Sequence, residues 1–135
     1  MRKCVGSIIE KTAFKNYEII VVDNGSNDRN REAVGSYLNA HGCQYVYEKA
    51  EFNFSRMCNL GAKAAKGDYR LFLNDDIEII QADSLSRLTG ACQQKHIGAV
   101  GAKLYYPDST LIQHAGISNI FEGPSHNFLK WDDRR

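Results

Sequence analysis

Apolar runs that alternate with helix-like segments are the feature that most constrains how this chain can fold. Residues 17–23 (YEIIVVD) and 69–73 (YRLFL) are continuous apolar runs, which are typical of strands buried on both faces of a sheet. Parallel strands need crossover connections, so the helical patterns between the runs predict a three-layer α/β/α arrangement around a mostly parallel sheet. The expected helices cover residues 2–12, 30–42, 55–67 and 83–96, and further strands are expected at residues 43–49 and 97–106.

Local signals predict where several of these elements end. Gly42 is expected to stop the second helix, while Ser55 is the expected N-cap and Gly67 the expected C′ residue of the third. Residues 107–110 (PDST) predict a turn, from which residues 111–118 return as the other arm of a hairpin.

Composition predicts one globular domain over residues 1–135. The chain is 43% hydrophobic and 24% charged, and its 17 basic and 16 acidic side chains are mixed along the sequence. A net charge of +1 gives no general attraction for nucleic acid or for anionic lipid. Four cysteines without a C-x-x-C pair favour reduced, structural thiols in a cytosolic protein. No signal peptide and no run of about 18 apolar residues, the length of a membrane span, are found.

Two adjacent acids follow the apolar run in residues 72–76 (FLNDD). At ~4 Å in an effective dielectric of ~20 their repulsion is about 4 kcal/mol, which a cation or solvent must relieve. If the backbone stays extended, Asn74 and Asp76 face one way and Asp75 the other, so two oxygen ligands converge. Such donors suit magnesium or manganese. Asn and Asp also form turns, so a solvated exit from the strand remains the alternative.

A second polar loop, residues 23–28 (DNGSND), follows the first expected strand. It has neither the G-x-G-x-x-G spacing nor the G-x-x-x-x-G-K spacing of the common phosphate loops. Its carboxylate and amide side chains offer hydrogen-bond donors and acceptors that suit a nucleobase or a ribose. The alternative is a tight turn at Gly25 with Ser26 or Asn27 starting a helix.

Three segments together resemble the family 2 glycosyltransferases of the GT-A fold, and especially bacterial rhamnosyltransferases and O-antigen transferases. The segments are residues 16–28 (NYEIIVVDNGSND), 52–80 (FNFSRMCNLGAKAAKGDYRLFLNDDIEII) and 100–117 (VGAKLYYPDSTLIQHAGI). The resemblance extends from about residue 2 to about residue 130, which is nearly the whole chain. It implies that the chain is the nucleotide-sugar-binding part of such an enzyme.

The resemblance also implies roles for individual residues. Asp23 and Asn24 match the pair that contacts the nucleoside, with Asn in place of the second acid, and Ser26 lies in the same implied nucleotide-sugar site. Asn59 matches the Asn of the family's A-R-N helix, where Cys58 stands in the Arg position.

The D-x-D metal segment of the family matches Asn74, Asp75 and Asp76, with Asn in place of the first Asp. The resemblance implies that Asp76 and Asn74 hold a manganese or magnesium ion and that Asp75 lies in the nucleotide-sugar site. His114 and His126 lie in segments similar to the family's "QHAG" and "G-x-x-H". We assign them no catalytic role and favour structural, hydrogen-bonded histidines.

The implied reaction is transfer of a sugar with inversion from a nucleoside-diphospho-sugar to a saccharide or lipid-linked saccharide. A divalent ion stabilises the leaving diphosphate, and a carboxylate base takes the proton of the acceptor hydroxyl. The acids Glu122, Asp132 and Asp133 do not match the family's base, so the catalytic residue is unknown. By association, rhamnose is the expected sugar, surface polysaccharide the expected product, and the cytoplasm, at the inner face of the bacterial membrane, the expected location.

Members of the family open with a strand that carries a Pro and an Asn, and this sequence begins at the helix that follows it. We therefore expect a piece truncated at both ends, lacking the first family strand, with weak or no transfer activity alone. One expected consequence is a homo-oligomer, in which a second copy of the chain supplies the missing strand pairing. The alternatives are a catalytically silent nucleotide-binding or interaction module and, less favoured, a phosphoryl-transfer α/β domain.

Overall fold

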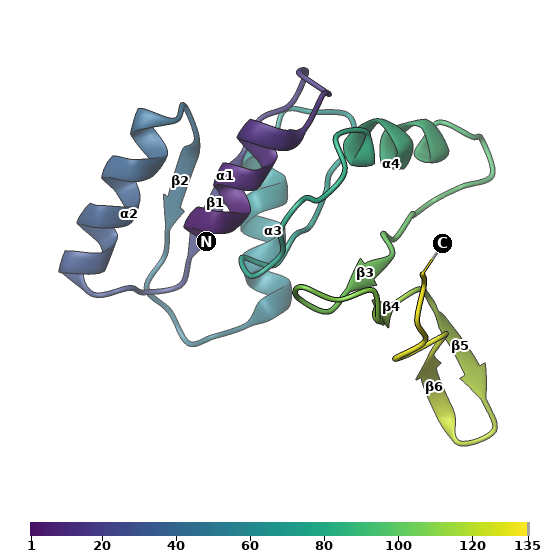
Figure 1. Ribbon diagram of the computed structural model, residues 1–135. Coiled ribbons are helices and arrows are strands. Elements are labelled where there is room, and N and C mark those ends of the chain that lie inside the picture. The colour runs from purple at the N-terminus through teal and green to yellow at the C-terminus, as the bar shows by residue number, and fades with distance from the viewer. Residues whose placement is uncertain (135) are drawn as a thin grey trace. The chain divides into compact units, whose positions relative to one another are not determined.

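Figure 1 shows the computed structural model, which describes residues 1–134. The chain divides into two units, Met1–Leu85 and Ser86–Arg135, and each is described by itself. The single domain expected over residues 1–135 stays a prediction. None of the helices among the described residues is both long and apolar enough to cross a lipid bilayer.

The first unit is built around a pair of parallel strands, β1 (Ile20–Asp23) and β2 (Gln44–Tyr47). In their register Ile20 lies opposite Gln44, and Asp23 lies opposite Tyr47. Parallel strands present their carboxyl ends at one edge, so the loops after β1 and β2 start side by side.

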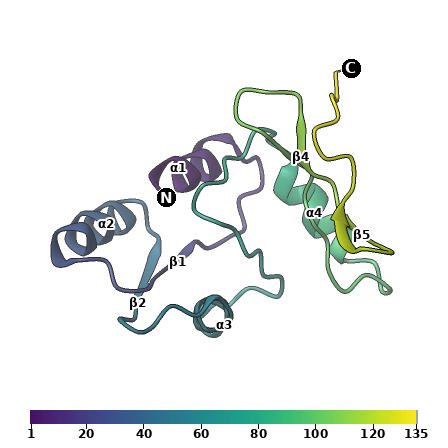
Figure 2. The same cartoon turned by 90° about the horizontal axis from the view of Figure 1, so that it is seen from below.

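Three helices accompany this strand pair: α1 (Arg2–Lys11), α2 (Asp28–Ala40) and α3 (Phe54–Ala64). Figure 2 shows α1 and α2 on one side of β1 and β2 and α3 on the other. Contacts of α2 with β2 and of α3 with β1 support that view. Helices therefore lie on both sides of a two-stranded parallel sheet, but the expected three-layer arrangement around a larger sheet is not clearly shown.

Helix α1 supplies part of a small core. Cys4 and Ile8 of this helix are buried with Ile79, and Tyr17 and Ile19 pack against them. Two hydrogen bonds tie the returning chain to this end of the unit: the Ile79 amide donates to Ser7 Oγ at 2.9 Å, and the Ala13 amide donates to the Ala82 carbonyl at 2.9 Å.

The ends of α2 agree with the sequence signals. The Asn27 side chain accepts a hydrogen bond from the Asn30 amide at 2.9 Å and caps the helix, as one of the two expected starting residues. Gly42 follows the helix with φ of +66°, a left-handed conformation that favours glycine.

The predicted ends of α3 are wrong. Asn53, rather than Ser55, caps the helix, because its side chain accepts a hydrogen bond from the Arg56 amide at 2.9 Å. The helix ends at Ala64 rather than near Gly67, whose amide donates instead to the Glu18 carboxylate at 3.1 Å. Asn is at least as good an N-cap as Ser, and here the helix begins after Asn53, the earlier of the two suitable residues.

The strand expected at residues 69–73 does not form. Tyr69, Leu71 and Phe72 are 51%, 51% and 59% exposed, and the described residues include no strand that pairs with this segment. An apolar run shows that a segment can be buried, but a strand also needs a partner for its backbone groups. The large, mostly parallel sheet of the sequence prediction is therefore not shown.

Helix α4 (Ser84–Cys92) starts at the end of the first unit and continues into the second. Residues 86–134 of the second unit then form four short strands: β3 (Leu104–Tyr105), β4 (Ile112–His114), β5 (Ile117–Ile120) and β6 (Gly123–His126). The antiparallel pairing of β3 with β4 confirms the hairpin predicted around residues 107–110, although β3 covers only the end of the expected strand. The second antiparallel pair, β5 with β6, was not predicted.

Candidate functional site

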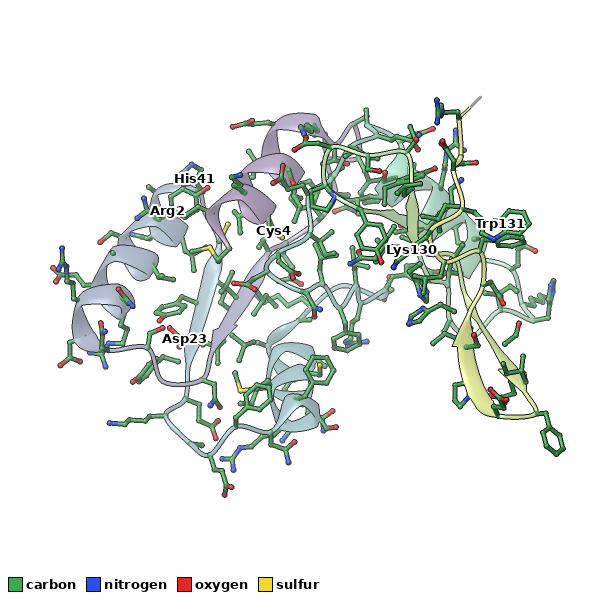
Figure 3. The ribbon with its side chains drawn as sticks, turned by 60° about the horizontal axis from the view of Figure 1, so that its bottom comes forward. Arg2, Cys4, Asp23, His41, Lys130 and Trp131 are labelled. Carbon is green, nitrogen blue, oxygen red and sulfur yellow. The ribbon has the colours of Figure 1, made fainter. Side chains whose placement is uncertain are left out.

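The loop after β1 is organised by the carboxylate of Asp23. Oδ1 accepts hydrogen bonds from the amides of Gly25 at 3.0 Å and Ser26 at 2.9 Å, and Oδ2 accepts one from the hydroxyl of Tyr45 at 2.5 Å. Gly25 adopts φ of +109°, which lets the chain turn back over the carboxylate. Figure 3 shows Asp23 at the end of β1. The loop thus has a fixed, preorganised negative charge.

These hydrogen bonds keep Asp23 ionised. Burial by itself would raise the pKa of the carboxyl, but the bonds from Tyr45, Ser26 and Gly25 outweigh burial and lower it. Burial and the bond to the carboxylate raise the pKa of Tyr45 to about 12. At neutral pH the pair is therefore a charged acceptor with a protonated phenol donor.

Asn24 lies next to this carboxylate and is only partly satisfied. Its Nδ2 donates to the carbonyl of Ala50 at 3.0 Å, whereas its Oδ1 is buried and accepts no hydrogen bond from the described residues. Leaving a buried acceptor unpaired costs about 1–3 kcal/mol, so an N–H or O–H donor from a ligand or water is expected there.

Ser26 is held by the second strand. The hydroxyl of Tyr47 donates to the Ser26 carbonyl at 3.2 Å, and the Arg31 guanidinium lies 4.9 Å from the centre of the Tyr47 ring. The side chain of Lys49 packs against Gly25, where an added Cβ would lie 3.5 Å from Lys49 Cγ. Cationic side chains therefore border the loop, which suits an anionic ligand.

Asn59 is exposed on α3, the helix that contacts β1. The close approach of helix and strand occurs at Gly61, where an added Cβ would lie 3.2 Å from Val22 Cγ2. At the start of the helix, Arg56 forms an ion pair with Glu48 just after β2. The helix is thus placed beside the loop-bearing strands, and Asn59 faces solvent.

The predicted metal residues are not arranged as expected. All three are exposed, and the Ile77 amide donates to the Asn74 carbonyl at 3.3 Å, so the backbone turns at Asp75 and Asp76 instead of remaining extended. The extended backbone, which was the condition for convergence of the Asn74 and Asp76 side chains, is therefore not met, and their role as metal ligands stays a prediction. The carboxylate of Asp75 lies 3.3 Å from the amino group of Met1 and is 79% exposed.

The donor types at this turn still suit a hard cation, because carboxylate and amide oxygens are ligands of Mg²⁺ and Mn²⁺. Within residues 1–134, however, no group of three or more His, Cys, Asp and Glu side chains could hold a metal ion. A cation here would need most of its ligands from a bound diphosphate and water.

Sequence reasoning missed Tyr45 and Tyr47, the two phenols that fix the loop. They stand two residues apart on β2, so they share a face of the strand, and the parallel register brings β2 alongside β1. The alternation of side chains in residues 43–49 was visible in the sequence. The register of β2 against β1, which places the two tyrosines beside the loop, was not.

Comparison with known proteins identifies the family. Residues 1–133 match the family model described as glycosyl transferase family 2. The chain is 40% identical over 119 residues to "Uncharacterized protein y4gI" of Sinorhizobium fredii, which covers 87% of this chain and 13% of that protein. It is 31% identical over 118 residues to "O-antigen biosynthesis protein RfbC" of Myxococcus xanthus, covering 87% and 9%. With "Uncharacterized glycosyltransferase EpsJ" of Bacillus subtilis it shares 29% identity over 109 residues, covering 81% and 31%.

No solved structure matches the chain significantly. The chain spans well under two thirds of each of these three relatives. Because the family model matches nearly every residue, the chain belongs to glycosyltransferase family 2.

Proposed function

We propose that this chain binds the nucleoside-diphospho-sugar donor of a glycosyltransferase that builds bacterial surface polysaccharide. Membership of family 2 supports a transferase, and the name of the Myxococcus relative supports a role in polysaccharide synthesis. The acceptor in this proposal is a saccharide or a lipid-linked saccharide. The proposed location is the cytoplasm, at the inner face of the membrane.

The observation that carries the proposal is the fixed carboxylate of Asp23 beside the unpaired amide oxygen of Asn24. An ionised carboxylate has about four acceptor positions, and three are used by hydrogen bonds within the protein. One position remains for a ribose hydroxyl, and the Asn24 oxygen can accept a second donor from the nucleoside. Ser26 extends the same loop, and Asn59 is proposed to contact the donor from α3.

A bound Mn²⁺ or Mg²⁺ would be held by Asn74 and Asp76 together with the donor's diphosphate, and it would stabilise the negative charge of the leaving diphosphate. Asp75 is proposed to lie against the donor at the same turn. The exposure of all three side chains leaves them accessible to such a ligand.

The proposed reaction inverts the anomeric centre. An acceptor hydroxyl attacks the anomeric carbon, the bond from that carbon to the diphosphate oxygen breaks, and the diphosphate leaves with the electron pair. A carboxylate takes the hydroxyl proton. We assign that role to none of the described residues. Rhamnose, carried by dTDP, is the sugar to test first.

Calorimetry on the full chain tests donor binding. We expect one of UDP-, dTDP- and GDP-sugars to bind, and to bind more tightly with Mn²⁺. Changing Asp23→Asn should weaken that binding by about 10- to 100-fold, because a hydrogen bond to a charged group contributes about 1.5–3 kcal/mol. The exposed Asp68→Asn variant is the control for net charge and should bind like the unchanged chain.

Two results would overturn the proposal. Heats that stay at the dilution level for every nucleotide sugar, with a folded chain by circular dichroism, would leave only an interaction module. Metal-dependent formation of an acyl phosphate on an Asp side chain would point instead to phosphoryl transfer.

A further inference from the structure

Two histidines of the second unit lie with their ring nitrogens facing each other. The Nδ1 atoms of His114 and His126 are 3.1 Å apart, and the rings meet edge to face with centroids 5.2 Å apart. His114 ends β4 and His126 ends β6, twelve residues later in the chain. The geometry joins two strands that are not paired with each other.

The backbone between the two residues explains their approach. Gly116, with φ of +103°, turns the chain from β4 into β5, and the hairpin of β5 and β6 then returns it. At the open end of that hairpin the Asn127 amide donates to the Gly116 carbonyl at 2.9 Å. The main chain therefore brings the ends of β4 and β6 to the same place.

The close approach limits where the protons can be. Two Nδ1–H groups cannot face each other at this distance, so at least one Nδ1 atom carries a lone pair directed at the other ring. A neutral imidazole can move its proton from Nδ1 to Nε2. When both rings hold the proton on Nε2, two lone pairs converge on the space between strands β4 and β6.

The distance between the two Nδ1 atoms matches the separation of two nitrogen ligands on one metal ion. Zinc–nitrogen bonds are about 2.0–2.1 Å long, so two ligand nitrogens lie about 3.3 Å apart at a tetrahedral angle and about 2.9 Å apart at a right angle. The observed 3.1 Å falls between these values. We propose that His114 and His126 form a two-histidine site for a first-row transition metal ion such as Zn²⁺, bound through both Nδ1 atoms.

Exposure favours this role over a purely structural one. His126 is exposed and His114 is half-buried, so their mutual hydrogen bond competes with water and contributes little to stability. The same exposure gives an ion access and leaves room for water in its remaining coordination positions. Among the described residues no third His, Cys, Asp or Glu completes the pair, so the site is open rather than closed.

Ligand type separates this site from the cation proposed for donor binding. Imidazole nitrogens prefer zinc, nickel and copper, whereas the carboxylates and amide of Asn74 to Asp76 prefer magnesium and manganese. The proposal therefore does not depend on the proposed function. Nucleotide binding in manganese can fail while zinc binding succeeds, and the reverse also holds.

Zinc calorimetry tests the site in a chain whose partly exposed thiols have been removed as competing ligands, by changing Cys43, Cys58 and Cys92 to serine. We expect saturable binding of one Zn²⁺ per chain. His114→Gln and His126→Gln should each weaken it about a hundredfold or more, because the second imidazole binds intramolecularly. The exposed His96→Gln is the matched control and should leave the affinity unchanged.

Nitrogen-15 NMR of the histidine rings gives a reading that needs no variant. Without metal, one ring of the pair should carry its proton on Nδ1 and donate it to the unprotonated Nδ1 of the other ring. With Zn²⁺, both rings should become Nε2–H tautomers with Nδ1 bound to the ion. Unchanged tautomers at saturating zinc would overturn the proposal. Equal zinc affinity in the serine-substituted chain and in the same chain with both His114→Gln and His126→Gln would overturn it too.

Discussion

At the scale of single residues, the hydrogen bond between Tyr45 and Asp23 joins the two parallel strands at their functional edge. We predict that Tyr45→Phe lowers the free energy of unfolding by about 1–2 kcal/mol, because the Asp23 carboxylate loses a neutral donor in a partly buried place. Urea denaturation followed by circular dichroism measures the change.

Tyr37→Phe provides the control for this prediction. The Tyr37 hydroxyl makes a long, exposed hydrogen bond of 3.4 Å to the Arg2 carbonyl, so its removal should change stability by less than about 0.5 kcal/mol. Equal effects of the two substitutions would show that the Tyr45 bond has no special weight.

The lowered pKa of Asp23 makes a prediction about acid stability. A carboxyl whose pKa is lower in the folded than in the unfolded state stabilises the fold above its unfolded pKa of about 3.9, and that contribution is lost as pH falls through the folded value. Asp23→Asn should therefore flatten the fall of stability below about pH 4. Denaturation at a series of pH values measures the slope, and a slope as steep as that of the unchanged chain would contradict the assignment.

At the scale of elements, the start of α3 offers a direct comparison of two neighbouring polar residues. Asn53→Ala should destabilise the chain by about 1 kcal/mol, because the Arg56 amide loses its cap. Ser55→Ala should cost less, because Ser55 lies inside the first turn and caps nothing. Urea denaturation of both variants measures the change. A larger loss of stability for Ser55→Ala would support Ser55 as the N-cap, as the sequence predicted.

Elements defined by local signals were predictable, and elements defined by a partner were not. Helices α1 and α2 and strands β1 and β2 follow from apolar patterns, an Asn cap and a glycine stop that act within a few residues. Residues 69–73 have an equally strong apolar pattern, but no strand in the described part of the chain pairs with them. The hairpin of β5 and β6 was missed because its turn residues, Phe121 and Glu122, are not typical turn formers, and its strands lack a clear alternation of apolar residues.

The same contrast holds at the site. Asp23 and its loop were predictable, because an acid followed by Asn-Gly after a buried strand is a local signal. The tyrosines of β2 depend on register between strands, and the turn at Asp75 and Asp76 depends on the path of the chain after residue 73. The pair of His114 and His126 depends on a hairpin that the sequence did not reveal.

At the scale of the whole molecule, the apolar side chains of residues 69–73 predict self-association. Phe72 is 59% exposed, and its segment pairs with no strand among residues 1–134, so its apolar side chains and backbone groups are open to another chain. Phe72→Lys should lower the concentration-dependent mass measured by analytical ultracentrifugation. Phe121→Lys is the control, since Phe121 is fully exposed at the tip of the β5–β6 hairpin. Equal loss of association in both variants would mean general hydrophobicity rather than this segment.

Trp131, labelled in Figure 3, is the single tryptophan of the chain and is 65% exposed in the second unit. Intrinsic fluorescence excited at the indole therefore reports on Ser86–Arg135, whereas the far-ultraviolet signal of the long helices reports mainly on Met1–Leu85. An optical experiment that records both during heating would distinguish one cooperative transition from two, without any label or truncation.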